Sequence, residues 1–424
     1  MDVTERSLWR HGDFMKLWTG QTVSELGSVV TRTALPLVAI LTLHATAIEV
    51  GLLVASASIG VIAVGLFAGA LVDRSSRRPL MIAADAIRAL LVLSIPVAAL
   101  GGVLRIEQLY VVAFLEAALG SLFEIAYRAY LPSLLPAERL LEGNAKIGMT
   151  GAIGEIGGPG LAGALVQAIT APLAMLVDAV SFVLSALSIA LIATPERRVE
   201  RIERQGVRRE LAEGLDAVAR HPLLRPLALA AATSMLFGNF FASLYTLYAL
   251  NELGLSPLML GIVISAGGVG SLLAAWLAGP LTRRLGLGRT IVWTSVAGVP
   301  VGLLTALAAG PPLVAALFLF VPQLVGDALD SVAAIDEITL RQLVTPARLL
   351  GRVTGSLHVL RKGIAPLGAL AGAAVAETFG IRTAVWIAVL GSSAGVAFLL
   401  LSPLRTLRVS PADVVPEPRG RSEA

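Results

Sequence analysis

Polar and acidic side chains recur at helical spacing within four long apolar stretches of the sequence. Residues at offsets of three, four and seven positions lie on one face of a helix. The four stripes are Gln21, Glu25, Ser28 and Arg32; Glu116, Phe123 and Tyr127; Asn239, Ser243 and Thr246; and Gln323, Asp327 and Asp330. The spacing predicts four polar helix faces that share one wet path.

Carboxylates in apolar helices can exchange protons or attract a cation. One charge at the centre of a membrane-spanning helix costs about 2.5–3.5 kcal/mol, so several of them in one chain indicate a use. Glu25 is the leading candidate for proton exchange, since it lies roughly eleven residues into its stretch, near mid-depth. Asp327 and Asp330 rank next and could equally attract a cationic substrate. The alternative for each carboxylate is an ion pair or a protonated carboxyl that holds helices together.

The residues predicted to form the proton-coupling and substrate cavity are Glu25, Arg32, Gln21, Glu116, Asn239, Tyr245, Gln323, Asp327 and Asp330. Tyr245 and its aromatic neighbours would contact a lipophilic substrate. Packing or a place in an interfacial aromatic belt is the other interpretation of these rings.

Other chemistry is excluded by what the sequence lacks. It contains no cysteine, its four histidines are scattered singly, and no nucleotide-binding GxxxxGK[ST] loop is present. We therefore expect no enzyme, no metal and no cofactor, with the proton gradient as the energy source.

Composition predicts an all-α membrane protein. Apolar residues make up 56% of the 424 residues and charged residues only 15%, against about 25% in soluble domains. A membrane-spanning helix needs roughly 20 mostly apolar residues. The predicted spans are 14–42, 48–72, 80–100, 107–131, 145–169, 172–193, 225–250, 257–279, 288–309, 313–337, 352–376 and 382–402.

Basic residues set the expected orientation. Of 33 Lys and Arg residues, 29 fall in the even-numbered connections and the two tails. The positive-inside rule places these segments in the cytoplasm. The basic pI of 9.7 is thus a topology signal and predicts no nucleic-acid partner. We expect a multi-pass monomer in the lipid bilayer of a bacterial inner membrane, with both termini cytoplasmic.

The chain divides into two halves that resemble each other. Residues 1–193 and 225–402 form the predicted six-helix bundles, 194–224 a cytoplasmic linker with a short amphipathic helix, and 403–424 a disordered cytoplasmic tail. The Gly69 segment recurs 210 residues later at Gly279. Pro159 is matched with Pro366. This pattern predicts a parallel repeat about an axis along the membrane normal.

Four segments resemble a known family. Gly69-x-Leu71-x-Asp73-Arg74-x-Ser76-Arg77-Arg78 resembles the loop 2–3 signature of the major facilitator superfamily. The run from Gly154 to Gly163 is similar to the Gly-Pro motif of its proton-coupled exporters. The segments from Phe14 to Gly27 and from Asp178 to Phe182 resemble the enterobactin-exporter and macrolide-efflux branch.

This resemblance implies two pseudo-symmetric six-helix bundles around a central cavity lined by spans 1, 4, 7 and 10. It also implies a conformational latch and a functional helix 5 motif. The latch residues are Gly69, Asp73, Arg74, Arg77, Arg78 and Arg128, and the helix 5 motif residues are Gly154, Gly158, Pro159 and Gly163.

The function expected from these features is secondary active transport by alternating access. Proton-coupled efflux of a small amphipathic molecule, such as a drug, antibiotic or siderophore, is the leading hypothesis. Proton-coupled uptake of a small solute is one alternative, and a receptor or scaffold that kept the fold without transport is another.

Overall fold

The computed structural model describes residues 8–194, 196 and 207–407; the side chains of Arg10 and of residues 66–74, 207 and 208 lie outside that description. Its regular elements in this part of the chain are helices, and twelve are long and apolar enough to cross a membrane. The predicted all-α class and the twelve spans are confirmed. The tail from residue 408 on lies outside the described residues.

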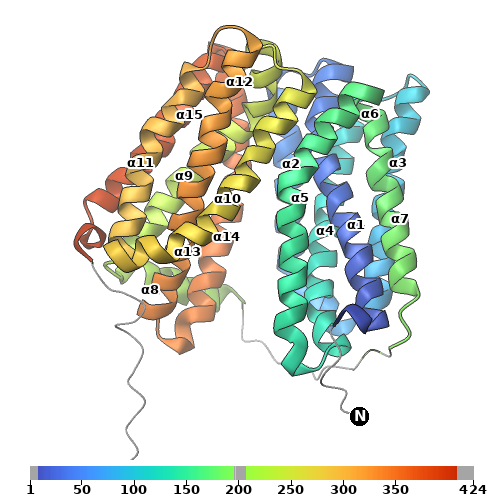
Figure 1. Cartoon of the computed structure of the whole chain (residues 1–424), viewed down its shortest axis with the longest axis horizontal. Helices are drawn as coiled ribbons and strands as arrows, with labels where there is room; N and C mark the ends of the chain where they lie inside the picture. Colours follow the sequence, from blue (N-terminus) through green and yellow to red (C-terminus); the bar gives the residue numbers. More distant parts are fainter. Residues whose placement is uncertain (1–7, 195, 197–206, 408–424) are drawn as a thin grey trace, which may run out of the picture.

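Two six-span bundles stand side by side (Figure 1). The first contains α1 (Gly12–Leu37) with the π-helical turn η3 (Val38–Thr42), α2 (Ala47–Arg74), α3 (Arg77–Leu100), α4 (Ile106–Leu134), α5 (Leu140–Ile169), α6 (Ala171–Ala174) and α7 (Leu176–Ala190). The second contains α9 (Leu224–Leu247) with the π-helical turn η5 (Tyr248–Glu252), α10 (Pro257–Leu285), α11 (Leu287–Leu307), α12 (Pro312–Val321), the π-helical turn η6 (Pro322–Gly326), α13 (Asp327–Val344), α14 (Ala347–Phe379) and α15 (Ile381–Leu400).

The two bundles repeat each other at a constant offset of 210 positions. The π-helical turns η3 and η5 end spans 1 and 7 at this offset. Nδ1 of His11 accepts a hydrogen bond from the backbone N–H of Phe14 at 3.1 Å, and Nδ1 of His221 accepts one from the N–H of Leu224 at 3.3 Å. Local caps and turns thus preserve the repeat where the surrounding side chains differ.

The same register corrects one prediction from the sequence. Residue type matches Pro159 with Pro366. At an offset of 210, however, Pro366 corresponds to Ile156, and Pro159 corresponds to Ala369. The two prolines therefore lie at different heights in the equivalent helices α5 and α14, and the match by residue type is wrong.

The bundles touch at the end of the molecule away from the N-terminus (Figure 1). Gly163 in α5 lies against the backbone of Pro257 in α10, and the backbone N–H of Gly160 donates to Oγ of Ser265 at 3.0 Å. In the parallel contact, Gly51 of α2 lies against α14. We call the end where these contacts lie the opposite end, because it lies opposite the start of α1. Glycine permits the close approach because it carries no Cβ.

At the other end, where the N-terminus and α8 (Val207–Arg220) lie, the ribbons of the two bundles diverge (Figure 1). We call this the linker end. The amphipathic helix predicted in the linker is α8, and it packs on α14. Glu213 of α8 forms an ion pair with Arg352, and Ser356 donates to the carbonyl of Leu211 at 3.0 Å. The helix is therefore part of the second bundle's structure.

Candidate substrate-binding and proton-coupling site

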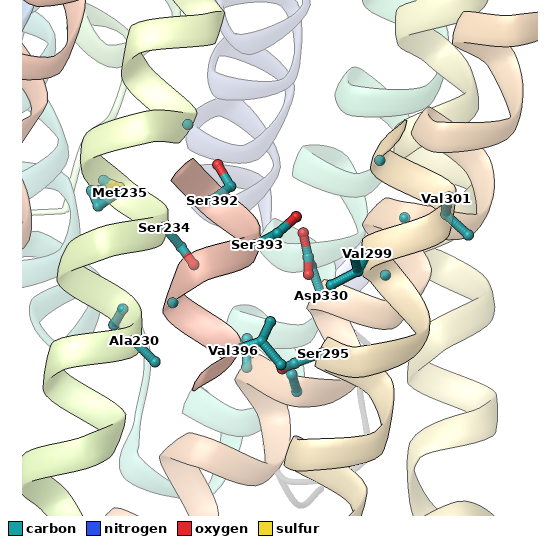
Figure 2. Close-up of a pocket in the computed structure, with 18 of the residues that line it drawn as sticks. Ala230, Ser234, Met235, Ser295, Val299, Val301, Asp330, Ser392, Ser393 and Val396 are labelled. Carbon is teal, nitrogen blue, oxygen red and sulfur yellow. The ribbon is translucent and has the colours of Figure 1, made fainter. Parts of the chain in front are cut away.

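A cavity of about 540 Å³ lies inside the second bundle, between α9, α11, α13 and α15 (Figure 2). We call it the C-bundle cavity. Ligand pockets in proteins commonly measure about 300–1,000 Å³. Helix α9 does not pack extensively on α13, and α11 packs less closely on α15 than α3 packs on α7 in the first bundle. The space arises from this looser packing.

Small and apolar residues form most of the cavity wall, and a few polar groups break it. Hydroxyl groups come from Ser234 on α9, Ser295 on α11, and Ser393 on α15, and the charged group drawn in the close-up is Asp330 on α13. Figure 2 shows Asp330 and Ser393 pointing toward one another. An apolar space with few, localised polar groups suits an amphipathic ligand.

The second carboxylate, Asp327, stands where span 10 is interrupted. The π-helical turn η6 ends directly before it. Such turns are frequent at functional sites. The carboxylate of Asp327 and the amide of Gln323 both lie against Gly267 of α10, where no side chain intervenes. The hydroxyl of Tyr245 is buried beside Gln323 without a well-formed hydrogen bond.

Neither Asp327 nor Asp330 forms an ion pair or a hydrogen bond with another residue that the structure describes. Arg361 and Glu337 also line the cavity, and they pair with each other: Nη2 of Arg361 lies 2.7 and 2.8 Å from the two oxygens of Glu337. Nη1 of Arg341 lies 3.5 Å from the same carboxylate. Asp327 and Asp330 thus face the cavity without a cation partner among the described residues.

The interior of the first bundle differs, because it contains a buried cation. Nη2 of Arg88 lies 2.6 Å from Glu116 and 3.2 Å from Oγ of Ser28, and Nη1 lies 3.5 Å from Asp85. The guanidinium lies 4.0 Å from the ring centre of Phe182, in a cation–π contact. Glu116, predicted from the sequence as a cavity residue, therefore points into this cluster.

Asp178 adds a third carboxylate to the same interior. Its Oδ1 accepts a hydrogen bond from Oγ of Ser181 at 2.9 Å, and it lies near Arg88. Sequence reasoning cited Asp178 only as part of a family-like segment. Its isolation in span 6, far from other acids in the sequence, gave no sign that it joins Arg88.

Helix α1 holds the remaining predicted residues of the first bundle. Nη2 of Arg32 lies 2.9 Å from Glu25, and both side chains remain partly exposed. Glu25 lies near Gly154, the first glycine of the helix 5 motif. The side-chain oxygen of Gln21 is buried without a hydrogen-bond partner in the described structure.

Asn239 stands at the position of the second bundle that is equivalent to Val29, and its side chain hydrogen-bonds within its own helix. Its amide donates to the carbonyl of Met235 at 2.8 Å, and its Cβ faces Gly368 of α14. Val29 faces Gly158 of α5 in the same way. The helix 5 glycines Gly154 and Gly158 thus pack against α1.

Pro159 and Gly163 lie on the face of the helix 5 motif that contacts α10. The carbonyl of Pro159 lies against Gly261 of α10, and Gly163 lies against the backbone of Pro257. The motif therefore joins α5 to α1 within its bundle and to α10 across the bundle contact.

The predicted latch residues lie at the linker end. The backbone N–H of Arg77 donates to both oxygens of Glu196 at 3.0 and 2.9 Å, and Nε of Arg78 donates to the carbonyl of Ile189 at 3.1 Å. Arg128 pairs with Glu124 at 2.6 Å on the surface. These contacts lie within the first bundle or join it to Glu196 of the linker, and none of them reaches the second bundle.

The remaining latch residues, Gly69, Asp73 and Arg74, have side chains outside the described residues, so a latch stays a prediction.

These features define a class of protein. Twelve spans in two pseudo-equivalent bundles, joined at one end, with carboxylates and a cavity at membrane depth, are those of a polytopic transporter rather than an enzyme. A family model described as Major Facilitator Superfamily matches residues 17–360. The chain belongs to this superfamily, which confirms the resemblance noted in the sequence.

Two relatives extend over most of the chain. The uncharacterized MFS-type transporter YfiS of Bacillus subtilis is 27% identical over 391 residues, covering 90% of this chain and 91% of YfiS. The multidrug efflux pump Tap of Mycolicibacterium fortuitum is 27% identical over 393 residues, covering 88% of this chain and 91% of Tap.

Solved structures share the fold. A bacterial homologue of the iron transporter ferroportin in its inward-facing state aligns with a TM-score of 0.73 at 18% identity, covering 93% of this chain and 99% of that one. The outward-facing state of such a homologue gives a TM-score of 0.59, covering 92% and 98%.

Proposed function

We propose that this transporter exports a small amphipathic molecule in exchange for protons, by alternating access across a bacterial cytoplasmic membrane. One observation carries the proposal: Asp327 and Asp330 face a membrane-embedded cavity without a cation partner among the described residues. A carboxyl in this position can hold a proton in one access state and release it in the other.

Direction and orientation have separate support. Basic residues concentrate in the even-numbered connections and tails, which favours a cytoplasmic linker end. With that orientation, the bundles diverge toward the cytoplasm, where an exporter collects its substrate. The likeness to the multidrug efflux pump Tap over most of both chains favours export over uptake.

Coupling is assigned to the carboxylates of span 10 rather than to Glu25. The carboxylate of Glu25 already has Arg32 as a partner at 2.9 Å, whereas Asp327 and Asp330 have no cation partner among the described residues. Asp327 and Asp330 instead face the cavity, so that a proton and a bound ligand would compete for the same carboxylates.

Transport into inverted membrane vesicles tests the proposal. Ethidium, tetracycline and chloramphenicol supply a cationic, a zwitterionic and a neutral amphipathic probe. We expect accumulation of at least one probe under an acid-inside gradient, and its loss when nigericin collapses that gradient. The double variant Asp327→Asn and Asp330→Asn should reduce the coupled rate at least tenfold.

The matched control is Asp216→Asn, which removes a carboxylate from an exposed pair with Arg220 and should transport as the native protein does. Accumulation that needs the reverse gradient would overturn export. Coupled transport at the native rate by the double variant would overturn the assignment of the proton.

A further inference from the structure

The C-bundle cavity occupies the place that side chains fill in the first bundle. Arg88 of α3 lies over the ring of Phe182, and Cβ added to Gly120 of α4 would lie 3.3 Å from Nη2 of Arg88. The residues 210 positions later are Gly298, Ser392 and Asp330, and all three line the cavity. The large and small positions are thus exchanged between the two bundles.

The contacts around both interiors confirm that this register holds locally. Gly60 lies against the backbone of Phe114 and Ala118, and Gly270, 210 positions later, lies against the backbone of Leu324 and Ala328. The backbones of spans 4 and 10 therefore stand at equivalent places, despite the π-helical turn η6.

A second contact pair gives the same register for spans 6 and 12. Gly27 lies against Ser181 in the first bundle, and Phe237 lies against Gly391 in the second. Each residue of the second contact lies 210 positions after its counterpart in the first. The positions equivalent to Arg88 and Phe182 therefore hold the small residues Gly298 and Ser392 in the second bundle.

Both interiors contain carboxylates, but the carboxylates stand at different positions in the two bundles. The equivalents of Asp85 and Asp178 are Ser295 and Ala388, which also line the cavity. The acids of the second bundle come instead from Asp327 and Asp330 on span 10. The interior of the first bundle thus contains a guanidinium stacked on a ring. The equivalent place in the second bundle is a cavity that Asp327 and Asp330 line.

We propose that the C-bundle cavity binds an organic cation that carries a planar apolar group. The cation takes the place of the Arg88 guanidinium beside Asp330 and Asp327, and the planar group takes the place of the Phe182 ring. The role of this site in export rests on the proposed function, but binding itself does not.

The lining supplies the contacts that such a ligand needs. Ser393 points toward Asp330 (Figure 2) and can hydrogen-bond a ligand N–H beside the carboxylate. Phe241 and Met235 on α9 offer an aromatic face and a polarisable thioether to the planar group. A charge desolvated in an apolar space requires a partner of opposite sign, which excludes an anionic ligand.

Binding to the purified full-length chain in lipid nanodiscs tests the proposal without transport. Ethidium, a planar phenanthridinium cation, is the probe, and its fluorescence anisotropy reports binding. Phenanthridine is the uncharged ring counterpart, and guanidinium is the cation without a ring. We expect ethidium to bind at least tenfold more tightly than either counterpart, measured by competition.

Two variants locate the site. Gly298→Arg supplies the guanidinium that the first bundle has, and should weaken ethidium binding at least tenfold without lowering the thermal unfolding temperature. Asp330→Asn changes almost no volume, and should weaken ethidium binding severalfold while leaving phenanthridine binding unchanged. The second variant remains informative if the first one misfolds.

The matched control is Gly355→Arg, the same substitution on α14 at a place where an added Cβ meets no neighbour; it should bind ethidium as the native chain does. Native ethidium affinity in Gly298→Arg or in Asp330→Asn would overturn the site. Equal affinity for phenanthridine and ethidium would overturn the ligand class.

Transport by the same variants separates this proposal from the proposed function. Coupled transport of ethidium at the native rate by Gly298→Arg would overturn the site and leave the exporter standing. Ethidium binding with these variant effects, but with no coupled transport of any probe, would support the site and overturn the exporter.

Discussion

The two bundles share a backbone plan but treat charge in opposite ways. In the first, Arg88 is surrounded by Asp85, Glu116 and Asp178 and is almost wholly buried. In the second, Gly298 stands at the position of Arg88, and Asp330 faces a cavity of about 540 Å³. Both interiors contain carboxylates, but Asp327 and Asp330 lack, among the described residues, the cation partner that Asp85 and Glu116 have in Arg88.

This difference indicates which bundle is the rigid one. A cluster of charges in direct contact, stacked on a ring, fixes the positions of α3, α4 and α7 relative to one another. An unfilled space destabilises a protein, and an unpaired carboxylate makes no stabilising contact with its neighbours. Features that add no stability and yet occur together at one place mark functional sites. The second bundle is therefore expected to adapt to a ligand, while the first serves as its support.

The largest expected effect comes from removing the buried cation. Arg88→Met preserves the length of the side chain but leaves Asp85 and Glu116 without their partner. Breaking a buried ion pair from one side costs about 3–5 kcal/mol. We expect a corresponding loss of unfolding free energy, measured as the thermal unfolding temperature in detergent.

Arg128→Met is the matched control for Arg88→Met. Its pair with Glu124 lies on the surface, where the two side chains are 76% and 60% exposed. Surface pairs contribute about 0–1 kcal/mol. Equal destabilisation by the two variants would mean that the Arg88 cluster does not hold the first bundle together.

The sequence predicts the spans, the acids and their partners within one helix, such as Arg88 for Asp85, but not the partners that lie on other helices. Hydropathy and length are local properties, so the twelve spans could be predicted. The stripe of Gln323, Asp327 and Asp330 was equally visible as spacing. The ion pair of Arg88 with Glu116 could not be predicted, because it joins two helices, α3 and α4, whose contact leaves no local pattern in the sequence.

The C-bundle cavity could not be predicted for a different reason. Its walls contain small neutral residues such as Gly298 and Ser392, which carry no signal of their own. They acquire meaning only when set against Arg88 and Phe182 at an offset of 210 positions. That offset was visible at Gly69 and Gly279, but contacts in three dimensions were needed to extend it through every helix.

An intermediate effect is expected at the two contacts between the bundles. Gly51 and Gly261 are equivalent positions, yet a Cβ added at Gly51 would meet the side chain of Ala373 first and the carbonyl of Ala369 only at 3.2 Å, whereas one added at Gly261 would meet the carbonyl of Pro159 first. Adding a methyl group to a tight contact costs about 1–3 kcal/mol. We expect Gly51→Ala and Gly261→Ala to open the opposite end.

Labelling with a maleimide measures this opening. The chain has no cysteine, so Ser265→Cys, at the contact of α5 with α10, gives a single reporter. Both alanine variants should raise its labelling rate. Adding Ala373→Gly should restore the slow rate in Gly51→Ala only, since a side chain can be removed and a carbonyl cannot. Rescue of Gly261→Ala by that same change would contradict the assignment of contacts.

The smallest effect on stability is expected at the unpaired carboxylate itself. Asp330 forms no ion pair with a described residue, so Asp330→Asn removes a charge without leaving another charge alone, and the unfolding free energy should change by about 0.5 kcal/mol or less. Glu116→Gln changes a carboxylate of the first bundle in the same way, but it deprives Arg88 of its contact at 2.6 Å and should destabilise severalfold more. Thermal unfolding of the two ligand-free variants gives the comparison. If Asp330→Asn were as damaging as Glu116→Gln, Asp330 would have a protein partner in solution, and the cavity would have no free charge to offer a ligand.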